Sequence, residues 1–108
     1  MKRKDKLGGV LVHFHGHDGR IDGVLARKTT YADGSLCLVG YQGVEPYAIF
    51  SVNIVSLAYK LNPGEIFFKT YSENAGMLEQ LQTDGVVGPE LFKVSTGWVS
   101  VPAVKVLI

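Results

Sequence analysis

The feature that most constrains this chain is a repeated alternation of apolar and polar residues, broken by turn-forming residues about every eight to twelve positions. Alternation with a period of two is typical of strands that bury one face. The Ala32-Asp33-Gly34-Ser35 segment predicts a tight hairpin turn, because Asp-Gly tolerates positive φ. The pattern predicts strands over six segments, which are 7–15, 21–31, 35–42, 45–54, 65–71 and 98–107.

The period changes after residue 71. Ser72 is in position to cap a helix over 73–83, and Gly85 follows its expected end. The apolar residues of this segment fall on one side of a helix, which predicts that it packs on a sheet. Segments 55–64 and 86–97 are expected to be a connection and a loop. The predicted fold class is α+β, with one mostly antiparallel twisted sheet or partly closed barrel of about six strands and one packed helix, about 73–83.

Length and composition favour one globular domain over 1–108. The chain is 46% hydrophobic and 19% charged, which is unlike a disordered protein. No apolar run approaches the roughly 20 residues that a transmembrane helix needs, and the basic start is not followed by a secretory hydrophobic segment. Cys37 is the single cysteine, so an internal disulfide is excluded and a reducing compartment, the cytoplasm of the cell that makes the chain, is expected. Its alternation with leucines predicts a buried thiol.

The net charge of +1 is unevenly distributed. Residues 2–6 hold four basic groups and one acid, and the rest of the chain has seven basic and nine acidic residues, about −2. We expect residues 1–6 to form a basic, flexible tail. A body of this charge lacks the positive field of a duplex-binding protein and the negative field of a nucleic-acid mimic. Weak nucleic-acid contact is predicted for the tail, through Lys2, Arg3, Lys4 and Lys6.

All three histidines fall in the segment VLVHFHGHDG. His13 and His15 have the spacing of two metal ligands on one strand face. His17 joins them only if the chain bends at Gly16. We interpret these histidines as the polar face of a strand whose other face is Val10, Val12 and Phe14. A metal site of His13, His15 and a carboxylate is kept as an alternative, and its candidates are Asp18, Asp22 and Glu45.

The same segment, VLVHFHGHDGRIDGV, is similar at His13 and His15 to the H-x-H-x-D-H segment of metallo-β-lactamase-fold hydrolases. His17 and Asp18 stand where that motif has Asp and then His, and no histidine follows position 17. Those enzymes also need later ligands and a much longer chain. We therefore interpret the similarity as coincidental.

The segment EIFFKTY predicts two different strand faces. Ile66, Phe68 and Thr70 share one face, which we expect to pack against the helix. Phe67, Lys69 and Tyr71 share the other, and an aromatic–Lys–aromatic row is typical of a protein interface or a single-strand binder. We predict a partner-binding surface that continues into the following turn, made of Phe67, Lys69, Tyr71, Glu73 and Asn74.

Three further segments carry a resemblance to a known family. YQGVEPYAIFSVNI (41–54), GEIFFKTYSENAGMLEQL (64–81) and STGWVSVPAVKV (95–106) resemble a domain-of-unknown-function family of small proteins carried by bacterial phages and conjugative elements. The residues at Val44-Glu45 depart from its simplest pattern, and the histidine strand is not part of it. The resemblance implies an accessory protein of a mobile element that binds a host macromolecule. It assigns a role to no residue.

Three functions follow as hypotheses. The first is a non-catalytic phage or mobile-element protein that binds a host protein or ribonucleoprotein complex, as a counter-defence inhibitor of the anti-CRISPR or antirestriction type. It requires no cofactor and is not an enzyme, in line with the lack of a P-loop, G-x-S-x-G or G-x-G-x-x-G motif. The second is a nucleic-acid or nucleotide-binding module that uses the sheet aromatics and the basic tail. The third is a small zinc-binding protein or hydrolase built on the His13-x-His15 strand. Pro102 predicts an edge or bulge in the last strand, and that strand is compatible with pairing in a homodimer.

Overall fold

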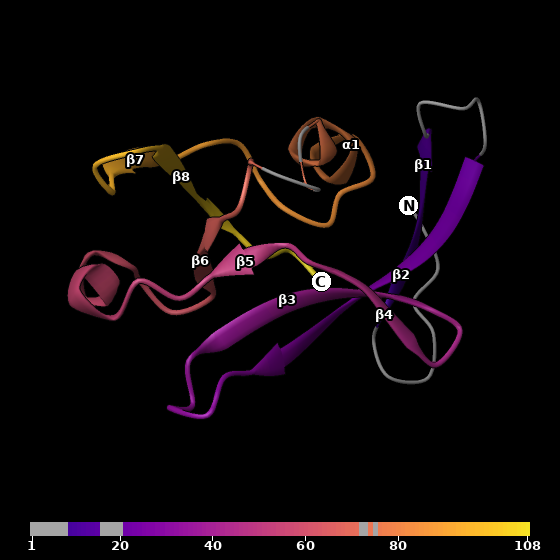
Figure 1. Cartoon of the computed structure of the whole chain (residues 1–108), viewed down its shortest axis with the longest axis horizontal. Helices are drawn as coiled ribbons and strands as arrows, with labels where there is room; N and C mark the ends of the chain where they lie inside the picture. Colours follow the sequence, from indigo (N-terminus) through magenta and orange to yellow (C-terminus); the bar gives the residue numbers. More distant parts are fainter. Residues whose placement is uncertain (1–8, 16–20, 72–73, 75) are drawn as a thin grey trace.

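The computed structural model describes residues 9–15, 21–71, 74 and 76–108. Within them, eight strands form two antiparallel sheets of four strands each, and one short α-helix, α1 (Met77–Thr83), packs beside them (Figure 1). The first sheet has the order β1-β2-β3-β4, with β1 at Val10–His15, β2 at Ile21–Thr30, β3 at Leu36–Gln42 and β4 at Glu45–Ile49. The second has the order β5-β6-β8-β7, with β5 at Ser51–Val52, β6 at Glu65–Phe68, β7 at Phe92–Ser95 and β8 at Ser100–Lys105.

This arrangement confirms the predicted α+β class with mostly antiparallel strands. The hairpin between β2 and β3 forms at the expected turn, where Gly34 has a φ of 85°. The turn is closed by the N–H of Tyr31, which donates to the carbonyl of Ser35 at 2.8 Å, and by that of Gly34, which donates to Tyr31 at 2.9 Å. Among the described residues, no helix is long and apolar enough to cross a membrane.

The segment expected as one strand over 45–54 is divided between the two sheets at Phe50. The N–H of Phe50 donates to the carbonyl of Leu38 in β3 at 2.9 Å, whereas its own carbonyl accepts from the N–H of Lys69 at 2.7 Å. Phe50 is therefore the residue at which the chain passes from the first sheet to the second. This crossover explains why alternation that is continuous in sequence yields two sheets.

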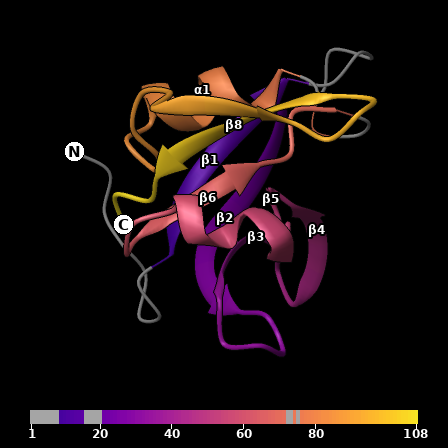
Figure 2. The same ribbon diagram turned by 90° about the vertical axis from the view of Figure 1, so that its left-hand side faces the viewer.

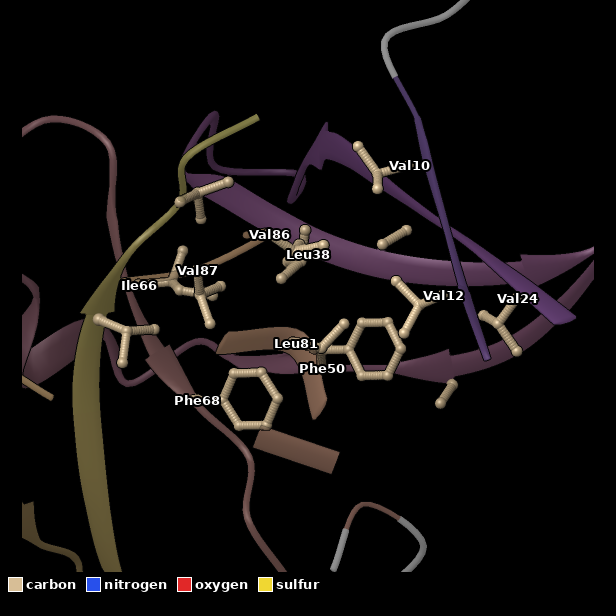
Figure 3. Close-up of a cluster of buried hydrophobic side chains, with 14 of the residues drawn as sticks. Val10, Val12, Val24, Leu38, Phe50, Ile66, Phe68, Leu81, Val86 and Val87 are labelled. Carbon is tan, nitrogen blue, oxygen red and sulfur yellow. The ribbon is translucent and has the colours of Figure 1, made fainter. Parts of the chain in front are cut away.

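The main core lies between the two sheets and α1 (Figure 3). The rings of Phe50 and Phe68 stack with centroids 6.1 Å apart, and Phe14 packs against Phe50 at 5.9 Å. Leu81 is the buried residue of α1 and contributes to the same core. The core thus takes apolar side chains from the first sheet, the second sheet and α1, including Val12, Val24, Leu38, Ile66, Val86, Val87 and Val104.

A second, smaller core covers the opposite face of the second sheet. Its buried members are Phe67, Val94, Val101 and Ala103. The connection after β5 forms a 3-10 helix, η1 (Val55–Lys60), and Leu57 and Leu61 of this segment pack against the cluster. The predicted connection is therefore a covering element, which makes the second sheet buried on both faces.

Two predictions about where elements lie are wrong. The helix begins at Met77 and not at 73, because Gly76 has a left-handed φ of 81° that an α-helix cannot include. The expected cap, Ser72, lies outside the described residues. The segment 86–97 is not only a loop, since it contains the four-residue strand β7, whose short alternation is a weak signal.

The last strand is also not an edge strand, because β8 lies between β6 and β7. Pro102 is opposite Lys93 of β7, and the pairing of β8 with β6 ends one residue away, at Ala103. Pro102 has no N–H to donate. A proline is tolerated here because it lies beyond the last residue pair between β8 and β6. Pairing with a second copy, with which the sequence of this strand is compatible, would need a free strand edge, and β8 is paired on both sides.

Candidate functional site

The predicted partner-binding residues are divided between the surface and the interior. Phe67 is only 1% exposed, and its ring meets that of Phe92 edge-on at a centroid distance of 6.3 Å. The expectation that Phe67 belongs to an exposed face is wrong, because η1 covers that side of β6. Glu73 lies outside the described residues.

Lys69 and Tyr71 are half-buried in the segment that follows β6. The ammonium of Lys69 lies 5.6 Å from the centroid of the Tyr71 ring, which is a cation–π geometry. The Tyr71 ring also packs against the second core. The structure therefore brings these two predicted residues together next to a buried apolar cluster.

Asn74 is fully buried and holds this segment against the first sheet. Its Nδ2 donates to the carbonyl of Ile49 at 2.8 Å, and its backbone N–H donates to the carbonyl of Tyr71 at 3.2 Å. Its Oδ1 is buried without a hydrogen-bond partner among the described residues. These contacts give Asn74 a positioning role for the turn that carries Tyr71, in place of the predicted surface contact.

Trp98 is the exposed aromatic residue that sequence reasoning missed. It lies in the turn between β7 and β8 with a relative exposure of 97%. The turn is closed by Thr96, whose N–H and Oγ1 reach the carbonyl of Val99 at 3.0 and 3.2 Å, and Gly97 has a φ of 93°. The sequence predicts strand throughout 98–107, whereas the Thr96-Gly97 pair before it signals the turn.

Figure 2 shows the β7–β8 turn and the segment after β6 directed toward the same end of the second sheet. Val99, which follows Trp98, packs against the second core as Tyr71 does. We name these residues, Lys69, Tyr71, Trp98 and Val99, the tip surface. Tryptophan and tyrosine are among the residue types enriched at the centres of protein interfaces.

The histidine strand has the predicted alternation. Val10, Val12 and Phe14 are buried, whereas His13 is exposed and lies opposite Gly23 of β2. In the part of the chain that the structure describes, no group of three or more His, Cys, Asp or Glu side chains could hold a metal ion. That part does not include several of the predicted site residues, namely His17 and Asp18, the side chains of His15 and Asp22, and the tail residues Lys2, Arg3, Lys4 and Lys6. Glu45, the remaining candidate, is exposed in β4.

A polar cluster joins the two sheets where Tyr31, which follows β2, meets Ser51 of β5. The hydroxyls of Tyr31 and Ser51 are 2.7 Å apart, and Ser51 Oγ also accepts from the N–H of Leu38 at 3.0 Å. Cys37, at 5% exposure, has its Sγ 3.6 Å from the same oxygen, which confirms the predicted buried thiol. Burial raises the pKa of Tyr31 to about 12. The Tyr31 phenol is thus neutral at physiological pH.

Asp33 in the β2–β3 turn is another of the described groups whose pKa is displaced. Its carboxylate accepts from the N–H of Ser35 at 2.9 Å, from the Ser35 hydroxyl, and from Nδ2 of Asn53 at 3.0 Å. These hydrogen bonds to the ionised form lower the pKa of Asp33 to about 2. Both displaced groups therefore take part in hydrogen bonds that hold turns and strands together.

No family model matches this chain, and neither a curated protein nor a solved structure matches it.

Proposed function

We propose that this protein is a non-catalytic binding module whose tip surface contacts a partner protein. The observation that carries the proposal is the 97% exposure of Trp98 on a turn that hydrogen bonds hold closed. An exposed indole contributes little to folding, whereas its burial against a partner removes a large apolar area from water. A preformed turn also reduces the conformational entropy that binding costs.

The neighbouring residues support the same function. The Lys69 ammonium over the Tyr71 ring supplies a cation and an aromatic edge beside the second core. Interface centres that combine aromatic anchors with a few polar groups commonly carry most of the binding energy. The resemblance to small mobile-element proteins makes a host protein or ribonucleoprotein complex the expected partner, and counter-defence inhibition the expected consequence of binding.

The test compares two equally exposed apolar residues. Trp98 lies at the β7–β8 turn, and Val44, at 95% exposure, lies at the β3–β4 turn. Affinity purification from bacterial cells that express wild-type, Trp98→Ala or Val44→Ala protein is followed by quantitative mass spectrometry. We expect a stoichiometric partner with wild type and Val44→Ala, and its loss with Trp98→Ala. The same set of proteins with all three baits would refute the proposed contact surface.

The same variants distinguish protein binding from single-strand nucleic-acid binding. Aromatic side chains beside a lysine also stack on bases. A labelled oligonucleotide whose binding falls steeply with salt and is lost in Trp98→Ala would assign the tip surface to nucleic acid and overturn the protein-binding proposal.

A further inference from the structure

A groove of about 270 Å³ lies where the β2–β3 turn, η1 and the start of β6 meet. Figure 2 views the molecule from the side on which η1 lies. Residues from both sheets line the groove, so its shape depends on how the two sheets pack. Its lining combines apolar side chains with amide, phenol and carboxylate groups, among them Tyr31, Asn53, Ile54, Leu61, Asn62 and Glu65.

The carboxylate of Glu65 is held in place at one wall of this groove. It accepts from the backbone N–H of Asn62 at 2.9 Å and from Nδ2 of Asn62 at 3.5 Å. The N–H of Glu65 in turn donates to the carbonyl of Asn62 at 3.1 Å. Because a carboxylate offers about four acceptor positions, this fixed group still has positions for a ligand.

The groove lining is rich in acceptors, and none of the described residues that form it is Lys, Arg or His. One N–H of Asn53 Nδ2 donates to Asp33, and Oδ1 of Asn53 is an acceptor. Lys105 is opposite Glu65 in the β6–β8 register, and its Cε lies 3.9 Å from the place that a Cβ of Gly64 would take, but Lys105 itself is not part of the lining. A ligand that suits this groove therefore carries positive charge and several N–H donors.

We propose that the groove binds the guanidinium group of an arginine side chain, with Glu65 as its counter-charge. A guanidinium is planar, donates in a fork that matches a carboxylate, and is weakly hydrated, so it tolerates apolar walls better than an ammonium does. Ile54 and Leu61 supply such walls. This site lies at the start of β6 whereas the tip surface follows its end, so the proposal does not depend on the proposed function.

The experiment is a titration of ¹⁵N-labelled protein with N-acetyl-arginine-N-methylamide, followed by amide chemical shifts. We expect saturable shifts at Asn53, Asn62 and Glu65, with a Kd of the order of 1 mM. The neutral isostere, N-acetyl-citrulline-N-methylamide, is expected to bind at least about tenfold more weakly, because it lacks the charge that Glu65 recognises. A parallel titration with free L-arginine compares the affinity of the groove for the free amino acid with its affinity for an arginine residue in a polypeptide, which the blocked compound represents.

The matched variants are Glu65→Gln and Glu90→Gln. In Glu65→Gln the side-chain amide oxygen still accepts from Asn62, so the turn is retained, and an unchanged amide spectrum checks this. Glu90 is a carboxylate outside the groove, 3.6 Å from Lys93 Nζ. We expect at least about tenfold weaker binding in Glu65→Gln and wild-type binding in Glu90→Gln and in Trp98→Ala. Equal binding of the citrulline compound, or wild-type affinity in Glu65→Gln, would overturn the proposal, as would the absence of saturable shifts.

Discussion

The hydroxyl of Tyr31, just after β2, lies 2.7 Å from that of Ser51 at the start of β5, and this contact joins the two sheets. Ser51 is 3% exposed, and its Oγ is also the acceptor for the N–H of Leu38 in β3. One buried hydroxyl therefore satisfies polar groups from two segments of the first sheet. Ser51 can do so because it directly follows Phe50, the residue at which the chain passes from the first sheet to the second.

The first prediction concerns Ser51→Ala. The substitution leaves the buried N–H of Leu38 and the Tyr31 hydroxyl without their partner, and an unsatisfied buried polar group costs about 1–3 kcal/mol. We expect the free energy of unfolding to fall by that amount in urea denaturation. Ser100→Ala, at an exposed position of β8, is the control and should change stability by less than about 0.5 kcal/mol. Equal stabilities of the two variants would contradict a clamping role.

The second prediction concerns alkaline pH. Burial raises the pKa of Tyr31 from 10.0 to about 12, and Cys37 and Asp33 act in the same direction. Between these two values the unfolded chain loses the Tyr31 proton while the folded chain keeps it. Stability is therefore expected to fall as the pH rises from 10 to 12. In Tyr31→Phe this contribution is absent, so the wild-type protein should lose more stability than the variant over this range, as measured by urea midpoints.

The other tyrosines are common to both proteins and cancel in that comparison. If the stability of wild type and that of Tyr31→Phe fall equally between pH 10 and 12, Tyr31 titrates as an ordinary tyrosine. An ultraviolet titration of the phenolates provides an independent measurement, in which one tyrosine fewer should ionise above about pH 11 in the variant than in wild type.

The third prediction concerns acid. Hydrogen bonds from Ser35 and Asn53 lower the pKa of Asp33 from 3.8 to about 2. The stabilisation is present above pH 3.8 and is lost as the pH falls toward 2, because the unfolded chain then binds the proton first. An NMR titration of the Asp33 carboxyl carbon measures its pKa directly. In Asn53→Ala the pKa should move back toward 3.8, and an unchanged value would show that the Asn53 contact is absent in solution.

Structural features that are determined by residues close together in the sequence are predicted correctly. The β2–β3 hairpin follows from Asp33-Gly34, and the burial of Cys37 follows from its alternation with leucines. The division at Phe50 is not predictable in this way, because it rests on hydrogen bonds to Leu38 and Lys69, which are distant in sequence. Alternation alone shows that a strand has two faces and leaves open whether a second layer covers each of them.

The candidate site shows the same limit. Lys69 and Tyr71 are predicted together because they share one strand face, and they do lie together. Phe67 shares that face too, but η1, from a segment with weak periodicity, covers it. The sequence does not single out Trp98, because the strand is expected to begin at that residue, whereas Gly97 places it on a turn. Burial by another element is therefore the step that a single sequence does not provide.

The last prediction concerns the close approach at Gly40. A Cβ at this position would lie 2.6 Å from Cγ1 of Val24 and 2.8 Å from the ring of Phe50, so only glycine fits between them. Gly40→Ala is expected to lower the free energy of unfolding by about 1–3 kcal/mol, because the packed core must shift. Gly23→Ala is the matched control in β2, since its Cβ would meet Leu11 and His13 at ordinary distances of 3.6 Å or more.

Gly23→Ala should leave stability unchanged or raise it slightly, because alanine restricts the unfolded chain. The two variants add the same methyl group to neighbouring strands of one sheet, so their difference isolates the contact with Val24 and Phe50. Equal stabilities in thermal and urea unfolding would show that the Val24 and Phe50 side chains are not packed against Gly40 in solution.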